Sequence, residues 1–275
     1  MLRKVMKYDC RAVFRLWWIA AVVTVALSVL GGFAEIVKQN TGNVPDMITS
    51  SAGMILFFAY FCLFGLLLLS EVLIFIRFYR NFFTDEGYLT FTLPVKRETL
   101  FNSKILSGLA LVAASGGVCI LSNFIMFLIS DFDLIKSGEY FEAIADFIDA
   151  IPEDVMGYLI LYALEALVIL VLTVLLSVLF LYGCITFGSM IVKKGKLLSS
   201  IGIYIGANSI FSFSTQLLLI FGVASIAVWM EPMSEELAPK VVALLLLAVI
   251  LFLAILCALI YAFTHWMLGR KLNLN

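Results

Sequence analysis

Two acidic side chains lie inside long apolar runs of the sequence. Glu71 lies in a run over 53–77, and Glu165 lies in a run over 157–191. A charged side chain at the centre of a membrane helix costs about 2.5–3.5 kcal/mol on insertion scales, so such residues usually face a bundle interior or a cavity. Both are therefore candidates for substrate contact or gating. A hydrogen bond between helices is an equally good interpretation, and Glu71 is near enough to Arg77 to reach the membrane surface.

The sequence carries no complete catalytic motif. The string KKGKLLSS at 193–200 lacks the first glycine and the spacing of a phosphate-binding loop, and neither HExxH nor GxSxG occurs. The five cysteines show no CxxC spacing, and His265 is the single histidine. We therefore expect no metal site, no disulfide framework and no cofactor bound by this chain. The chain is not expected to be an enzyme or to bind nucleic acid.

The composition is typical of a membrane protein. Hydrophobic residues make up 63% of the chain and charged residues 13%, and the mean hydropathy is +1.11. Soluble domains are roughly 45–50% apolar and about 25% charged. A helix needs about 20 mostly apolar residues to span a bilayer. The sequence predicts an all-α integral membrane protein, a single transmembrane domain over 1–275, with six spans at about 16–36, 53–77, 104–130, 157–191, 199–229 and 241–268.

Lysine and arginine beside the spans predict the orientation, because cytoplasmic loops carry an excess of these residues. All but three of the 18 bases fall on one side, and the exceptions are Lys38, Lys136 and Lys240. Most of the acids fall on the other side, in the connections around 131–154 and 231–236. The bias alternates across all six spans. Both termini are therefore predicted to be cytoplasmic.

Two segments outside the spans have amphipathic patterns. Bases at Lys4, Lys7, Arg11 and Arg15 recur at helical spacing, which predicts an interfacial helix over 1–15 lying among anionic headgroups. A frayed basic tail is the alternative. The acidic segment 131–156 predicts a second interfacial or capping helix on the outer side. A solvated acidic face is the simpler interpretation of its charges.

Gly202 and Gly206 form a GxxxG pattern in the fifth span. Small residues at this spacing let two membrane helices approach closely. The pattern predicts helix packing, either between subunits or within one subunit.

The polar connection between the second and third spans contains what we call the docking segment, residues 84–94. Thr84 suits a helix N-cap, and the acids that follow favour a first turn. Pro94 ends the element, which predicts a short amphipathic helix. An interfacial turn is the alternative. Four aromatics in and before it resemble a recognition surface, since aromatics are enriched in interfaces: Phe82, Phe83, Tyr88 and Phe91.

The string FFTDEGYLTFTLPVKRETLFNSKIL resembles the segment between the second and third spans of ABC transporter permeases of the type-2 exporter class, notably those of Firmicutes. Members commonly carry an EGYLxxTLPV-like string, then a Ser-Lys pair, and a KLNL tail. Here these are 86–95, 103–104 and 271–274. Lys96 replaces the small hydroxyl residue that is common after this string, and Asn275 replaces the usual terminal acid.

The resemblance implies a non-catalytic permease subunit in a bacterial plasma membrane. A separate ATPase subunit, which would carry ATP and Mg²⁺, would bind the docking segment as a coupling helix, and 1–15 would be the connecting helix. A second permease chain, identical or different, would complete the pathway. The implied contact residues are Asp85, Glu86, Gly87, Tyr88, Leu89 and Phe91. A standalone secondary transporter or channel is the alternative, followed by a membrane enzyme or sensor. The substrate is not readable from the sequence.

Overall fold

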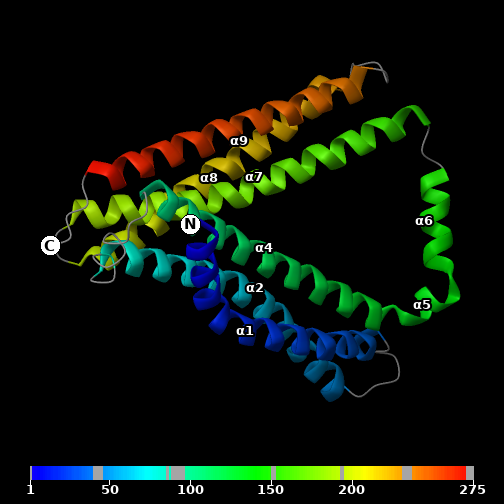
Figure 1. Cartoon of the computed structure of the whole chain (residues 1–275). Helices are drawn as coiled ribbons and strands as arrows, with labels where there is room; N and C mark the ends of the chain where they lie inside the picture. Colours follow the sequence, from blue (N-terminus) through cyan, green and yellow to red (C-terminus); the bar gives the residue numbers. More distant parts are fainter. Residues whose placement is uncertain are drawn as a thin grey trace. The chain divides into compact units, whose positions relative to one another are not determined.

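The structure, a computed structural model, describes residues 2–39, 46–84, 87, 97–149, 153–192, 195–230 and 237–270. These residues are helical apart from short turns (Figure 1). The long helices are α1 (Leu2–Gln39), α2 (Asp46–Phe83), α4 (Arg97–Ser130), α7 (Glu153–Ile191), α8 (Lys196–Met230) and α9 (Leu237–Arg270). Two short helices, α5 (Phe132–Ser137) and α6 (Glu139–Asp149), follow α4.

Among the residues that the structure describes, six helices are long and apolar enough to cross a membrane. This confirms the predicted number of apolar helices and gives the chain the character of a multi-pass helical membrane protein. The helices extend beyond the predicted spans. Pro239 lies in the first turn of α9, where the missing N–H of proline breaks no helical hydrogen bond.

α1 is one continuous helix. The predicted interfacial helix over 1–15 and the first span over 16–36 therefore join without a break. Figure 1 shows the first turns of α1 pointing in a different direction from the rest of the helix. The position of these turns in the headgroup layer stays a prediction.

The chain divides into two compact units. The first contains Met1–Arg77 and Asn102–Ile151, and the second contains Phe78–Phe101 and Pro152–Asn275. The division therefore passes through α2 and α4, near the ends that carry the docking segment. It leaves the prediction of a single transmembrane domain untested.

Small residues bring α1 and α4 together in the first unit. A Cβ added to Gly32 would lie 2.8 Å from the Cβ of Ile129, and one added to Gly31 would lie 3.1 Å from the Cε of Met126. Trp17 donates from its indole Nε1 to Ser115 Oγ over 2.8 Å. Close helix approach at glycine, with a polar contact between helices, is the packing mode favoured in membranes.

The second unit is built on α7, which packs against both α8 and α9. The closest approach to α8 is at Gly188, where an added Cβ would lie 2.5 Å from Ser200 Cα. Ser200 Oγ also donates to the carbonyl of Ile185 over 3.2 Å. On the α9 side, the Tyr162 hydroxyl donates to the Pro239 carbonyl over 2.8 Å.

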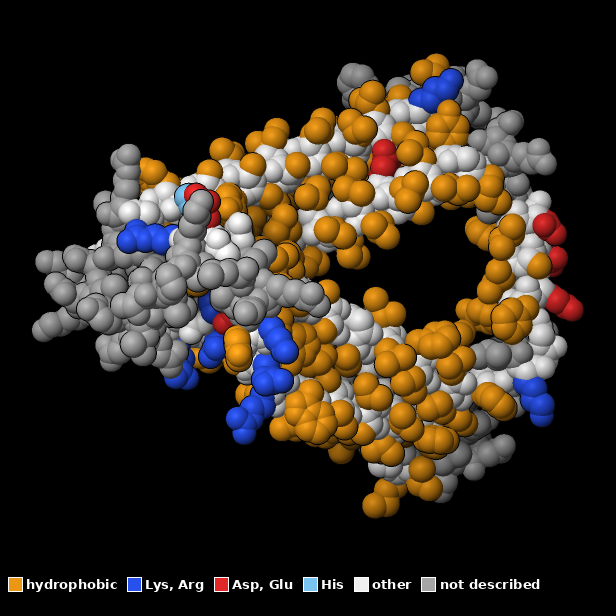
Figure 2. Space-filling model, in the orientation of Figure 1, with side chains coloured by type: hydrophobic (Ala, Val, Ile, Leu, Met, Phe, Trp, Pro, Cys, Tyr) orange, Lys and Arg blue, Asp and Glu red, His pale blue; other side chains and the backbone are white. Residues whose placement is uncertain are grey.

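Hydrophobic side chains cover the long helices, and acidic side chains gather on α6 (Figure 2). The predicted amphipathic helix within 131–156 is present over Glu139–Asp149. Its apolar stripe, which includes Phe141, Ile144 and Ile148, is exposed in this chain. An uncovered apolar stripe is consistent with a helix at a membrane interface.

Candidate functional site

Most of the docking segment lies outside the described residues. This applies to Asp85, Glu86, Tyr88, Leu89 and Phe91, so their predicted contacts remain predictions. Thr84 and Gly87 are described. The Thr84 hydroxyl donates to the Arg80 carbonyl over 2.6 Å, and the Gly87 N–H donates to the Thr84 carbonyl over 2.7 Å. The Thr84 side chain thus bonds to the last turn of α2, and the Thr84 carbonyl accepts from the turn that follows.

Gly87 is the one predicted contact residue whose surroundings are described. It is buried, and an added Cβ would lie 3.0 Å from the Phe82 carbonyl oxygen and 3.1 Å from the Phe82 carbonyl carbon. Both neighbours are backbone atoms, which cannot rotate away. The chain therefore turns so closely against the end of α2 that a side chain at position 87 requires a shift.

A buried aromatic cluster surrounds the helix ends that carry the docking segment. It consists of Phe78 and Phe82 on α2, Phe101 on α4, Tyr182 on α7 and Tyr261 on α9. The rings of Phe78 and Tyr182 stack with centroids 4.0 Å apart. The centroids of Phe78 and Phe82 are 4.9 Å apart, and those of Phe101 and Tyr261 are 5.5 Å apart. Ring pairs at these spacings add to the stabilisation that burial provides.

The cluster corrects one expectation. Phe82 is 2% exposed, so its assignment to a recognition surface is wrong. Its ring instead stacks on Phe78, one helical turn earlier. The i, i+4 spacing of these two rings on a predicted helix was the available signal, because such residues share one face.

Polar contacts join the start of α4 to the end of α9. The Arg97 guanidinium donates from Nη1 to the Gly269 carbonyl over 3.4 Å, where the partial negative charge of a helix C-terminus favours a cation. His265 Nε2 lies 3.8 Å from Glu98 Oε1. His265 also lies parallel to the ring of Tyr261, with centroids 6.1 Å apart.

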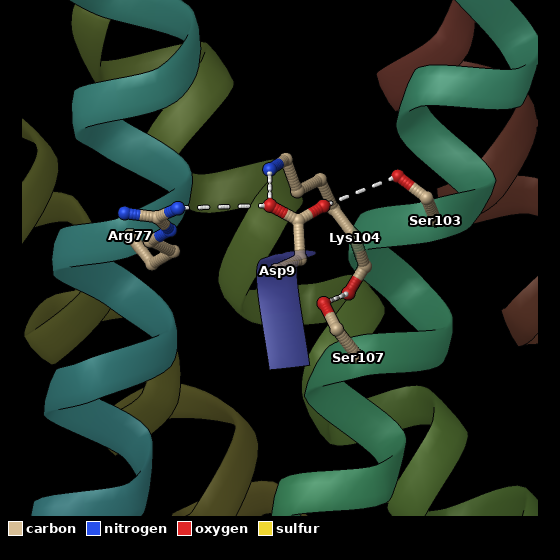
Figure 3. A network of polar contacts seen from close by, with 5 residues as sticks. All are labelled: Asp9, Arg77, Ser103, Lys104 and Ser107. Atoms are coloured by element: carbon tan, nitrogen blue, oxygen red, sulfur yellow. Dashed lines mark hydrogen bonds and ion pairs between the residues drawn. The ribbon is translucent and has the colours of Figure 1, made fainter. Parts of the chain in front are cut away.

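A second group of residues, the Asp9 network, lies in the first unit (Figure 3). Lys104 Nζ donates to Asp9 Oδ1, and Ser103 Oγ donates to Asp9 Oδ2 over 3.4 Å. Arg77 Nη2 lies 3.8 Å from Asp9 Oδ1. Ser107 Oγ donates to the Lys104 carbonyl over 3.0 Å. One carboxylate thus connects α1 to both α2 and α4.

The sequence pattern does not reveal Asp9 as a site residue, because this acid lies among five bases whose helical spacing dominates the segment. Lys104 carries an orientation signal and is the second residue of the Ser103–Lys104 pair, and neither feature points to Asp9. A separation of 95 positions in the sequence hides the contact between Asp9 and Lys104 from any local pattern.

The two predicted intramembrane acids have different environments. Glu165 on α7 is 8% exposed, and its Oε2 has no hydrogen-bond partner among the described residues. Glu71 lies at an exposed position of α2 and takes part in an interaction. A buried carboxyl oxygen without a donor is energetically unfavourable, which keeps Glu165 as the stronger functional candidate.

The predicted packing glycines do not closely approach another helix among the described residues. Around both Gly202 and Gly206, no described atom lies within 4 Å of an added Cβ. The close approach between α7 and α8 occurs instead at Gly188. Packing of the GxxxG face against a second chain stays a prediction.

The described residues contain no group of three or more His, Cys, Asp or Glu that could hold a metal ion. All five cysteines carry free thiols. Comparison of the chain with protein-family models, curated proteins and solved structures found no match.

Proposed function

We propose that this chain is the transmembrane permease subunit of an ATP-driven ABC exporter. In this proposal the docking segment binds a separate ATPase subunit on the cytoplasmic side, and both termini face the cytoplasm. The proposal rests on the string that runs from 82 to 106 and on the absence of a phosphate-binding loop in the chain. The energy for transport then enters from the partner.

The structural observation that supports the proposal concerns the two helix ends that flank the docking segment. The helix ends on its two sides lie in one buried aromatic cluster, with Phe78 and Phe101 each 1% exposed. Arg97 adds a contact to the end of α9. A surface loop needs no such support, whereas a docking surface must transmit displacement to the spans without yielding. Packed interiors meet this need because they are dense and resist compression.

The ATPase subunit would hold ATP and Mg²⁺, and two permease chains would form the pathway. Closure of two ATPase subunits around nucleotide would displace two docking segments. Tyr88 and Phe91 would contribute most of the docking energy, because aromatic rings do so when they fill pockets of a partner. The full set of predicted contact residues is Asp85, Glu86, Gly87, Tyr88, Leu89 and Phe91.

Affinity purification of the tagged chain from its own membranes tests the proposal. We expect a chain with a phosphate-binding loop to co-purify, and Tyr88→Ala/Phe91→Ala to lose it while the permease is still recovered. A matched control is Phe57→Ala/Phe61→Ala, which removes two exposed, stacked rings in the middle of α2. Retention of the ATPase by the docking variant would overturn the docking assignment.

A standalone transporter is the second candidate, and Glu165 is the observation that favours it. A buried carboxyl with an unpartnered oxygen is a feature of ion-coupled transporters as well as of substrate sites. Transport by the purified chain in vesicles without nucleotide would support this candidate. Loss of that transport in Glu165→Gln would identify the carboxyl that carries it.

A further inference from the structure

The Asp9 network is placed symmetrically about the docking segment. Arg77 precedes Phe83, the last residue of α2, by six residues, and Lys104 follows Arg97, the first residue of α4, by seven residues. Each contact is thus just under two helical turns, about 10 Å, from the helix end nearest the segment. The single carboxylate of Asp9 contacts both helices at matching depth.

Burial makes this contact difficult to break. Asp9 is 5% exposed and Lys104 is 4% exposed. A buried charge that loses its partner is strongly unfavourable, because neither water nor another group replaces the lost interaction. Separation of α1 from α4 would break the contact between these two buried charges and leave Asp9 with Arg77 at 3.8 Å. The buried contact between Asp9 and Lys104 therefore fixes the N-terminal part of α1 to α4.

The Asp9 network restricts rotation of α4 relative to α1. Ser103 donates to Asp9 as well, so two successive residues of α4 hold the same carboxylate. Ser107 donates to the Lys104 carbonyl one turn further along the helix (Figure 3). Rotation of α4 about its axis would break both contacts to Asp9. Movement of α4 together with α1 would preserve them.

We propose that Asp9 is a positioning residue for coupling. It fixes the N-terminal part of α1 to the two helices that carry the docking segment, so that displacement of the segment moves α1, α2 and α4 together. This role rests on the proposed function, since it needs a partner that displaces the segment. Without that partner, the same network would only stabilise the first unit.

The neighbouring thiol of Cys10 provides a readout that needs no ATPase. Cys10 is partly buried and free. We expect Asp9→Asn to raise the rate of Cys10 alkylation by N-ethylmaleimide about tenfold, because local opening of α1 no longer has to break the ion pair between Asp9 and Lys104. Burial and, after it, the Asp9 carboxylate raise the pKa of the Cys10 thiol. The rates are therefore compared per thiolate, from their pH profiles, so that the lost charge does not itself account for the change. Peptide-resolved mass spectrometry measures this rate in the otherwise unchanged chain. The control is Arg11→Gln, which removes an exposed charge two residues from Asp9. It should leave the rate of Cys10 alkylation unchanged.

The coupling role is measured on the reconstituted complex of permease and ATPase. We expect Asp9→Asn to retain the ATPase and its ATP hydrolysis, while substrate transported per ATP falls about fivefold or more, since α1 no longer follows the displaced segment. Ser103→Ala removes the 3.4 Å contact, keeps the Asp9–Lys104 contact and should give a smaller loss. If Asp9→Asn does not accumulate in the membrane, Ser103→Ala replaces it as the variant that tests the coupling role. In Asp9→Asn/Lys104→Met, the combined effect should be smaller than the product of the single effects, as expected for directly coupled residues.

The two arms separate the possible failures. Unchanged Cys10 alkylation in Asp9→Asn would overturn the connection between α1 and α4. Faster alkylation with unchanged transport per ATP would overturn the coupling role and leave a purely stabilising network. If the wild-type chain binds no ATPase, the proposed function fails, and the coupling role fails with it. The alkylation result would still report whether Asp9 holds α1.

Discussion

Two buried acids in this chain have opposite surroundings. The Asp9 carboxylate faces donors from Arg77, Ser103 and Lys104, whereas Glu165 Oε2 has no hydrogen-bond partner among the described residues. Buried charges usually persist where they are paired or where function needs them. Asp9 fits the first case, whereas a functional role for Glu165 stays a prediction.

Replacement of Glu165 separates function from stability. Removal of an unpartnered buried polar group should stabilise the chain by about 1–3 kcal/mol, so Glu165→Leu should raise the melting temperature in detergent. Transport should fall at the same time, as expected where a functional residue costs stability. Glu165→Gln keeps a buried polar group and should raise the melting temperature less. A lower melting temperature in Glu165→Leu would show that the carboxyl stabilises the fold through a contact of its own.

Gly87 tests the docking segment without removing a contact group. In Gly87→Ala the new Cβ meets the Phe82 carbonyl oxygen at 3.0 Å, so the segment must shift. A shift that costs about 1 kcal/mol of docking free energy lowers the affinity for the ATPase about fivefold, measurable by titration of the purified partner. Gly117→Ala, where nothing lies within 4 Å, is the control. Equal affinity in the two variants would mean that the turn at Gly87 does not position the docking surface.

At the scale of helices, hydropathy predicts that the six long helices exist. Packing decides at which residues these helices approach one another. Twenty or more apolar residues form a helix in lipid because every backbone polar group must be bonded within the segment. The pattern therefore identified all six long helices. It did not distinguish Gly188 from Gly202, because both lie in apolar helices and differ only in what approaches them. Long-range contacts such as Asp9–Lys104 were hidden for the same reason.

The two glycines give a matched prediction. In Gly188→Ala the new Cβ would lie 2.5 Å from Ser200 Cα, so α7 and α8 must separate. Overpacking of this kind costs about 1–3 kcal/mol. Gly202→Ala meets no described atom within 4 Å and should change stability by about 0.5 kcal/mol or less in the single chain. Thermal unfolding in detergent compares them. Equal melting temperatures would contradict the close approach at Gly188.

At the scale of the whole molecule, the docking segment belongs to a stretch of the second unit that interrupts the first unit in sequence. Residues Phe78–Phe101 belong with α7–α9, while Arg77 and Asn102 belong with α1. Hydropathy could not predict this division, because it arises from which helices pack together. A partner that binds the segment would act on α2 and α4 close to both passages.

The most direct test of docking is a photo-crosslink from the segment itself. A photoreactive phenylalanine analogue replaces Tyr88, and the control replaces Tyr60, which is exposed in the middle of α2. On irradiation of native membranes, we expect position 88 to crosslink to a chain with a phosphate-binding loop, and position 60 to give no such product, because lipid surrounds it. A position 88 that crosslinks to no ATPase, or that reacts with the same products as position 60, would contradict docking through this segment.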